Sequence, residues 1–259
     1  MVTETVRGVI MLVKQERENF WILNWLDEFM TGHKGFICGG CFKNIFNHEK
    51  VKDLDIFFNS KSDWEDAVNY FDSKTKGYVD IEQYDDETGL QEEYAEYTFY
   101  YKNDNVKAYK HKKTGVAIEL CCKIFGTAEE ILNQFDFTIT KFAYYKEEVE
   151  DETSAEVEKL DEELSELDSL LNEVSGEKTE THIEYRVMHD DKFFEHLHMK
   201  RLVVDNEIPF PMSTFERAFR YAKYGYLPCK ETKMKIINAL RELDDKQVEL
   251  SESLYDGMD

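Results

Sequence analysis

Two short stretches decide the fold of this sequence: FICGGCF at residues 36–42 and KDLDIFF at residues 52–58. Each contains an apolar run of the length of a buried β-strand. The second run carries Asp53 and Asp55 two positions apart. Because side chains alternate along a strand, both carboxylates are predicted to project from the same face. The segment between the runs, residues 43–48, is long enough for one or two helical turns.

The paired aspartates and the glycine pair that ends the first run are typical of a site for a divalent cation and a phosphate. Two close carboxylates repel unless a cation lies between them, and Mg²⁺ commonly binds one or two carboxylates together with substrate phosphates. Gly39 and Gly40 remove side chains where a phosphate would approach backbone N–H groups. Each feature occurs by chance, but together, after two apolar strands, they favour a site for Mg²⁺ and a phosphate.

The stretch from Gly39 to Phe58 resembles the active-site signature of the nucleotidyltransferase superfamily that includes DNA polymerase beta. It is most similar to the head domain of bacterial poly(A) polymerases and CCA-adding tRNA nucleotidyltransferases. That family shows Gly-Gly-x-Val-Arg-Asp, a short helix and then Asp-x-Asp, and the interval from Gly39 to Asp53 is the same. Residues 136–140, DFTIT, are similar to the family's Arg-Arg-Asp-Phe-Thr-x-Asn motif. Residues 217–226 look like the helix that follows the head domain.

This resemblance implies a metal-dependent, ATP- or other NTP-using transferase. Such an enzyme moves a nucleoside monophosphate to a hydroxyl and releases pyrophosphate, with two Mg²⁺ or Mn²⁺ ions as cofactors. The implied metal ligands and catalytic residues are Asp53, Asp55 and a third carboxylate. Glu119, the lone acid in an apolar strand, fits that third position; Asp136 is the competing candidate, and a solvent-facing Glu119 is an equal alternative. The implied nucleotide contacts are Gly39, Gly40, Cys41, Lys43, Asp136, Arg217 and Arg220.

Three departures from the family pattern limit what the resemblance implies. Phe42-Lys43-Asn44 replaces Val-Arg-Asp, and Gln134-Phe135 replaces the arginine pair. The base-selecting Asp-x-x-Arg pair of CCA-adding enzymes is not evident near Glu216. We therefore expect an NTP substrate and an acceptor that is either an RNA 3′ end or a protein side chain. The alternative is a non-catalytic nucleotide-binding or assembly protein that has kept the fold.

The pattern of apolar residues predicts an α+β protein. We expect a nucleotidyltransferase domain over residues 1–150, with a mixed sheet flanked by helices, one of them over 14–30. An acidic helical insert over 151–180 would follow, and then a helical C-terminal region over 181–259. Within the insert, apolar residues recur every three or four positions from 153 to 174, which indicates an amphipathic helix. A basic protein partner for this helix is one possible role.

The charge of the chain excludes some functions. Its 259 residues carry a formal charge of -23, so we expect no broad nucleic-acid surface and no binding to anionic membranes. Residues 146–180 hold 15 acidic residues and three lysines, which is about half of the excess. The sequence contains no apolar run of membrane-spanning length and no signal segment at its start, so we expect a cytoplasmic protein. Cys38 and Cys41 form a C-x-x-C pattern, but no second pair at zinc-site spacing supports a metal or redox reading.

Overall fold

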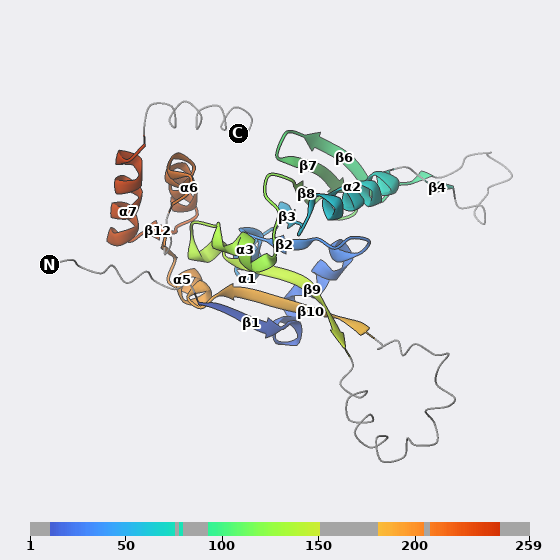
Figure 1. Ribbon diagram of the computed structural model, residues 1–259, viewed down its shortest axis with the longest axis horizontal. Coiled ribbons are helices and arrows are strands. Elements are labelled where there is room, and N and C mark those ends of the chain that lie inside the picture. The colour runs from blue at the N-terminus through green and yellow to red at the C-terminus, as the bar shows by residue number, and fades with distance from the viewer. Residues whose placement is uncertain (1–10, 76–77, 80–92, 151–180, 205–207, 244–259) are drawn as a thin grey trace, which may run out of the picture.

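The computed structural model describes residues 11–75, 78–79, 93–150, 181–204 and 208–243 (Figure 1). An eight-stranded sheet lies at its centre, and β3 and β8 pair in parallel while the other neighbours are antiparallel. The strand order is β1 (Leu12–Glu16), β10 (Thr181–Asp190), β9 (Phe142–Glu150), β2 (Phe36–Cys38), β3 (Asp53–Phe57), β8 (Ala117–Cys121), β7 (Val106–His111) and β6 (Tyr97–Lys102).

Helices and two short strand pairs surround this sheet. The strand pairs are β4 (Tyr78–Val79) with β5 (Glu93–Tyr94), and β11 (Arg201–Leu202) with β12 (Leu227–Pro228). The helices are η1 (Arg17–Met30), a 3-10 helix with a kink at Phe20, then α1 (Cys41–Phe46), α2 (Lys61–Thr75), α3 (Ala128–Asn133), the 3-10 turn η3 (Thr138–Thr140), α5 (Phe193–His198), α6 (Pro211–Lys223) and α7 (Lys230–Arg241).

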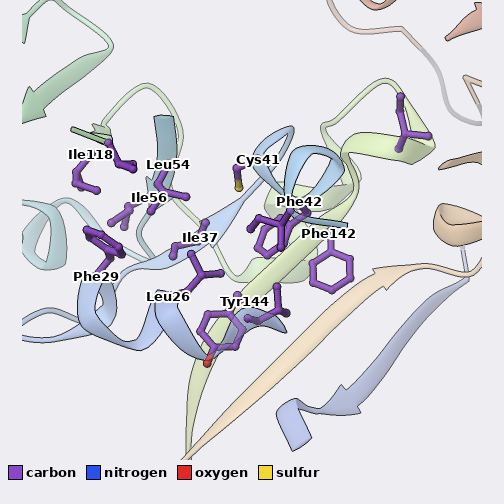
Figure 2. Close-up of a cluster of buried hydrophobic side chains, with 14 of the residues drawn as sticks. Leu26, Phe29, Ile37, Cys41, Phe42, Leu54, Ile56, Ile118, Phe142 and Tyr144 are labelled. Carbon is purple, nitrogen blue, oxygen red and sulfur yellow. The ribbon is translucent and has the colours of Figure 1, made fainter. Parts of the chain in front are cut away.

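The larger part of the core lies on the sheet face that η1, α1 and α2 cover. Leu54 and Ile56 of β3 point into it and are fully buried. Figure 2 shows them near Leu26 and Phe29 of η1 and Phe42 of α1. This is the alternation that the sequence KDLDIFF predicts: the apolar residues between the aspartates turn to the core, so the aspartates turn to the opposite face. A smaller apolar cluster on that opposite face is covered by α3.

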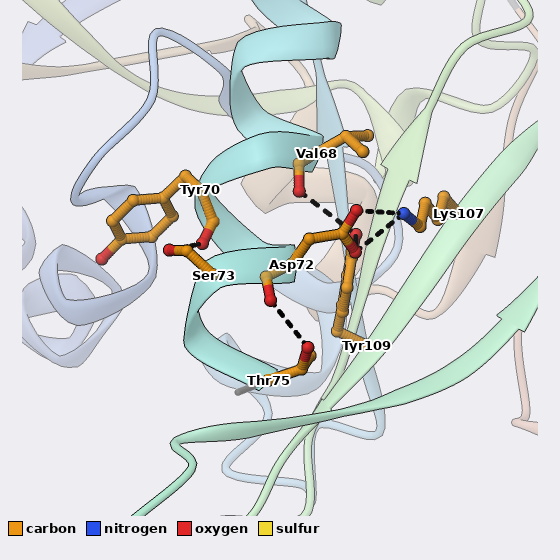
Figure 3. A network of polar contacts seen from close by, with 7 residues as sticks. All are labelled: Val68, Tyr70, Asp72, Ser73, Thr75, Lys107 and Tyr109. Atoms are coloured by element: carbon orange, nitrogen blue, oxygen red, sulfur yellow. Dashed lines mark hydrogen bonds and ion pairs between the residues drawn. The ribbon is translucent and has the colours of Figure 1, made fainter. Parts of the chain in front are cut away.

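A polar network ties α2 to the sheet on the core face. The Tyr109 hydroxyl donates a hydrogen bond to Asp72 Oδ1 over 2.7 Å (Figure 3). Lys107 Nζ lies 2.8 Å and 2.7 Å from the two carboxylate oxygens of Asp72. Lys107 and Tyr109 alternate with Ala108 on β7, so their side chains share the α2 face. The Asp72 carboxylate is therefore matched by a cation and a hydroxyl.

The structure confirms the predicted α+β fold with a mixed sheet flanked by helices, and it refines the predicted boundaries. The helix expected from residue 14 begins at Arg17, because residues 12–16 instead pair with β10. Residues 181–190 form β10 of the central sheet, so this part of the expected C-terminal helical region belongs to the same sheet as β9. The acidic helix expected over 153–174 lies outside the described residues.

Among the residues that the structure describes, no helix is both long and apolar enough to cross a membrane.

Candidate functional site

The two carboxylates at the centre of the candidate site come from neighbouring parallel strands. Asp55 of β3 and Glu119 of β8 are direct Cα partners in the β3–β8 register. Partners in register project from the same face of a sheet, here the face that carries α3 rather than α2. Both side chains are partly buried, and their carboxyl groups are within hydrogen-bonding reach of each other. The structure thus brings together two of the three predicted metal ligands.

The electrostatics of this pair are unfavourable without a partner of positive charge. Burial, and then the negative charges of Glu119 and Asp53, raise the pKa of Asp55 well above its usual value. Burial also raises the pKa of Glu119, an effect that the nearby Tyr101 hydroxyl opposes. No ion pair with Lys or Arg joins either carboxylate within the described part of the chain. A shared proton or a bound cation would therefore relieve the repulsion.

Asp53 begins β3 and is exposed at the rim of the site. Its Cα partner on β8 is Ala117, and this pair lies two positions along the strands from the Asp55–Glu119 pair. The described residues contain no group of three or more His, Cys, Asp and Glu side chains arranged to hold a metal ion. The donor chemistry of the inner pair nevertheless fits Mg²⁺, which in nucleotide sites takes one or two carboxylates and completes its shell with water and phosphate oxygens.

The glycine pair lies beside Asp55 and Tyr221. Gly39 has a φ of +104°, a backbone conformation that favours glycine. A Cβ at this position would lie 3.4 Å from Asp55 Oδ2 and 3.8 Å from the Phe135 ring. A Cβ at Gly40 would lie 3.1 Å from the Tyr221 hydroxyl oxygen. The loop therefore passes between Asp55 on one side and Tyr221 of α6 on the other, where side chains would block the approach of a ligand.

The predicted nucleotide contacts next to the glycines, Cys41 and Lys43, are buried. Burial, and then the charge of Asp55, raise the pKa of the Cys41 thiol, so it stays protonated. Lys43 Nζ lies 3.0 Å from Glu49 Oε2 and 5.0 Å and 5.8 Å from the ring centroids of Tyr224 and Tyr226. The Lys43 ammonium is thus engaged at the junction with the residues that follow α6.

The competing third carboxylate, Asp136, makes a different set of contacts. It is buried, and its Oδ2 accepts a hydrogen bond from the Thr214 hydroxyl over 2.8 Å. Arg217 Nη2 lies 2.9 Å from the same oxygen. Asp136 therefore attaches α6 to the sheet domain, while Glu119 is the carboxylate beside Asp55. Arg220, the other predicted cation on α6, is exposed.

Three residues at the site were missed by the sequence reasoning. Tyr101 lies within hydrogen-bonding reach of Glu119, Tyr221 lies against Gly40, and Phe135 lies against Gly39. A tyrosine in the helix after the head was visible in the resemblance, but its contact with the glycine loop was not. Phe135 places an aromatic ring beside the glycine loop.

Three of the five cysteines lie near Asp55. All five are free thiols. Cys38, Cys41 and Cys121 are buried, and burial together with the charge of Asp55 raises the pKa of each. Neutral thiols are weak nucleophiles and weak metal ligands. Cys38 and Cys121 belong to the apolar cluster on the α3 face, and Cys41 belongs to the larger cluster.

The mixed sheet flanked by helices is that of a nucleotidyltransferase fold, as comparison with a solved structure shows. A CCA-adding enzyme in complex with CTP superposes with a TM-score of 0.50 at 14% identity, over 93% of this chain and 49% of that one. A Thermotoga maritima CCA-adding enzyme complexed with tRNA gives 0.49 at 14% identity, over 90% and 47%. The chain thus spans about half the length of these structures.

Residues 16–200 match the Gabija anti-defense 2 family, and the chain belongs to that family. A comparison with curated proteins found no match.

Proposed function

We propose that this protein is a metal-dependent nucleotidyltransferase that transfers a nucleoside monophosphate from an NTP to a hydroxyl acceptor and releases pyrophosphate. The observation that carries the proposal is the Asp55–Glu119 pair, held in register on parallel strands beneath the glycine loop. The name of the family describes action against a defence called Gabija. We therefore place the acceptor hydroxyl in that defence, on a protein side chain or on the 3′ end of an RNA.

Each part of the site has a role in this reaction. A bound divalent cation would lower the pKa of the acceptor hydroxyl and neutralise charge on the phosphates. Asp55 and Glu119 would hold the cation, and Asp53 would reach it from the rim of the same face. Gly39 and Gly40 would let the triphosphate approach the backbone N–H groups. Tyr221 of α6, which lies against Gly40, would close the other side of the glycine loop.

The experiment offers the purified protein each α-³²P-labelled NTP with Mg²⁺ or Mn²⁺, in separate mixtures with Gabija proteins and with cellular RNA. Wild-type protein should transfer label, and Asp55→Asn and Glu119→Gln should each lower the rate by at least about 100-fold. Asp66→Asn is the matched control, because Asp66 is exposed on α2 at the other side of the sheet. Protease-sensitive label identifies a protein acceptor, and RNase-sensitive label identifies RNA. Absence of transfer in every mixture, or unchanged transfer by Asp55→Asn, would contradict the proposal.

A second function, inhibition by binding without catalysis, is favoured by two observations. No metal-holding group of three or more side chains is assembled among the described residues. Phe135 also stands beside Gly39 where the related enzymes have arginine. A cell assay separates the two functions: Asp55→Asn and Glu119→Gln variants that still block Gabija, at wild-type protein levels, would support the binding function.

A further inference from the structure

Four residues on four neighbouring strands form one row across the site face of the sheet. Asp55 of β3 is in register with Glu119 of β8, Glu119 with Ala108 of β7, and Ala108 with Tyr101 of β6. Neighbouring strands are about 4.8 Å apart, and residues in register project from the same face. Tyr101 therefore stands two strands from Glu119, about 10 Å between their Cα atoms, with Ala108 between them.

Ala108, between Tyr101 and Glu119, is small enough for the Tyr101 ring to extend across it. Ala108 is fully buried and contributes a single methyl group to the row. The Tyr101 ring lies partly buried on this face, and its hydroxyl comes within hydrogen-bonding reach of the Glu119 carboxylate. A larger side chain at position 108 would fill the space through which the tyrosine reaches the glutamate.

A β-bulge in β6 sets the direction of Tyr101. Phe99 is in register with Tyr109, but the next pair is Tyr101 with Ala108, so Tyr100 is an extra residue. Without it, Tyr100 would oppose Ala108, and Tyr101 would turn to the α2 face. Bulges are common beside active sites because they redirect side chains. Here the bulge places the tyrosine on the face of the carboxylates.

The direction of the Tyr101 hydrogen bond follows from its chemistry. A phenol keeps its proton near neutral pH, so the Tyr101 hydroxyl donates a hydrogen bond and the Glu119 carboxylate accepts it. One oxygen of Glu119 is then occupied by the hydroxyl. Asp55 stands on the other side of Glu119, on the neighbouring strand β3.

We infer that Tyr101 is a positioning residue, whose hydroxyl fixes the Glu119 carboxylate beside Asp55 for binding of a divalent cation. This inference rests on the proposed function, in which that pair holds the cation. Tyr101 touches neither the cation nor the substrate. It acts through Glu119 in the way that outer hydrogen-bond partners orient metal-binding carboxylates, where their loss typically weakens metal affinity by about 10- to 100-fold.

The test measures Mn²⁺ binding by electron paramagnetic resonance without nucleotide, and the Mg²⁺ dependence of the transfer rate. Tyr101→Phe should raise the Mn²⁺ dissociation constant about tenfold and raise the half-saturating Mg²⁺ concentration more than it lowers kcat at saturating Mg²⁺. Ala108→Val should have the same effect by blocking the reach of the tyrosine.

The matched control is Tyr109→Phe, which removes a hydroxyl of the same kind on β7 from Asp72 at the other face of the sheet. It should lower the melting temperature and leave the Mn²⁺ dissociation constant unchanged. Wild-type affinity and wild-type Mg²⁺ dependence in Tyr101→Phe would overturn the inference while the proposed function stands. A wild-type protein that neither binds Mn²⁺ nor transfers nucleotide would overturn both.

Discussion

On the face covered by α2, Tyr109 donates to Asp72, and Lys107 binds the same carboxylate (Figure 3). On the opposite face, Tyr101 reaches Glu119, but the next ionisable group in the row is a second carboxylate, Asp55. Strand β7 supplies Lys107 and Tyr109 to the first arrangement and Ala108 to the second. Lys107 balances the charge of Asp72. Among the described residues, no Lys or Arg forms an ion pair with Asp55 or Glu119.

This difference separates the residues that maintain the fold from those that serve the site. A paired carboxylate adds modestly to stability and connects α2 to the sheet. Adjacent carboxylates without a cation cost stability, and such costs are concentrated at functional sites, where a ligand compensates them. The four predictions below test this division, in order of decreasing effect.

Replacing Phe71 with Ala should cause the largest loss of stability, because this residue of α2 is fully buried. Its ring lies 5.3 Å from that of Tyr109 and 5.0 Å from that of Tyr97, measured between centroids. Truncation should cost about 3–5 kcal/mol of unfolding free energy by leaving a cavity. Urea denaturation measures this loss. A loss below about 1 kcal/mol would contradict the view that the α2 face maintains the fold.

Asp72→Ala should destabilise the protein by about 2 kcal/mol, discounted for the partial exposure of Asp72. It removes the partner of Lys107, whose side chain is 14% exposed, and of the Tyr109 hydroxyl. The same urea titration checks it, with the exposed Asp66→Ala on the same helix as the control. Equal stability of the two variants would show that the network contributes nothing measurable.

Asp55→Asn should have the opposite effect. It should raise the free energy of unfolding by about 1 kcal/mol at pH 8 in the presence of a chelator. The pKa of Asp55 is raised in the folded state, so its folded form favours the proton. Wild-type stability is therefore fully present below the unfolded pKa and falls as the pH rises through the folded pKa. Asparagine has no such dependence, and its advantage should shrink at pH 5. A variant less stable than wild type at pH 8 would contradict this.

Of the four changes, the addition of Mg²⁺ should have the smallest effect on the free energy of unfolding. At twice its dissociation constant, Mg²⁺ should raise the unfolding free energy of wild type by about 0.6 kcal/mol. Asp55→Asn should gain less, because one of the two carboxylates of the pair is lost, while Asp72→Ala should gain as much as wild type. Denaturation at matched ionic strength, with NaCl in place of MgCl₂, measures the difference. An equal gain in Asp55→Asn would place the cation elsewhere.

Local sequence patterns predicted the elements that carry the site. The alternation around Asp53 and Asp55 gave their common direction, and Glu119 was recognised as the lone acid in an apolar strand. Thr127 and Glu130 have the residue types and spacing of a capping box, and α3 begins after Thr127 with both hydrogen bonds of that box present. Each of these features depends on residues a few positions apart, which is the range that helix and strand periodicity cover.

Features that depend on pairing between distant segments were not predicted. Tyr101 turns toward Glu119 because of a bulge, and a bulge is defined only against its partner strand. The contacts of Asp136 with Thr214 and Arg217, far along the chain, were not predicted either. Residues 181–190 were assigned to a helical region, since nothing local shows that they pair with β9 and β1.

The position of β10 in the sheet has a consequence for the order of folding during synthesis. The strands that bear the carboxylates, β3 and β8, lie within the first 121 residues. The edge strand β1 leaves the ribosome earliest, but its partner is β10, with Leu12 opposite Asp190. At about 5–20 residues per second, β1 waits on the order of ten seconds or more for its partner. The strands that bear the carboxylates can therefore pair while the sheet is still open at its β1 edge, and closing that edge is a late step of folding.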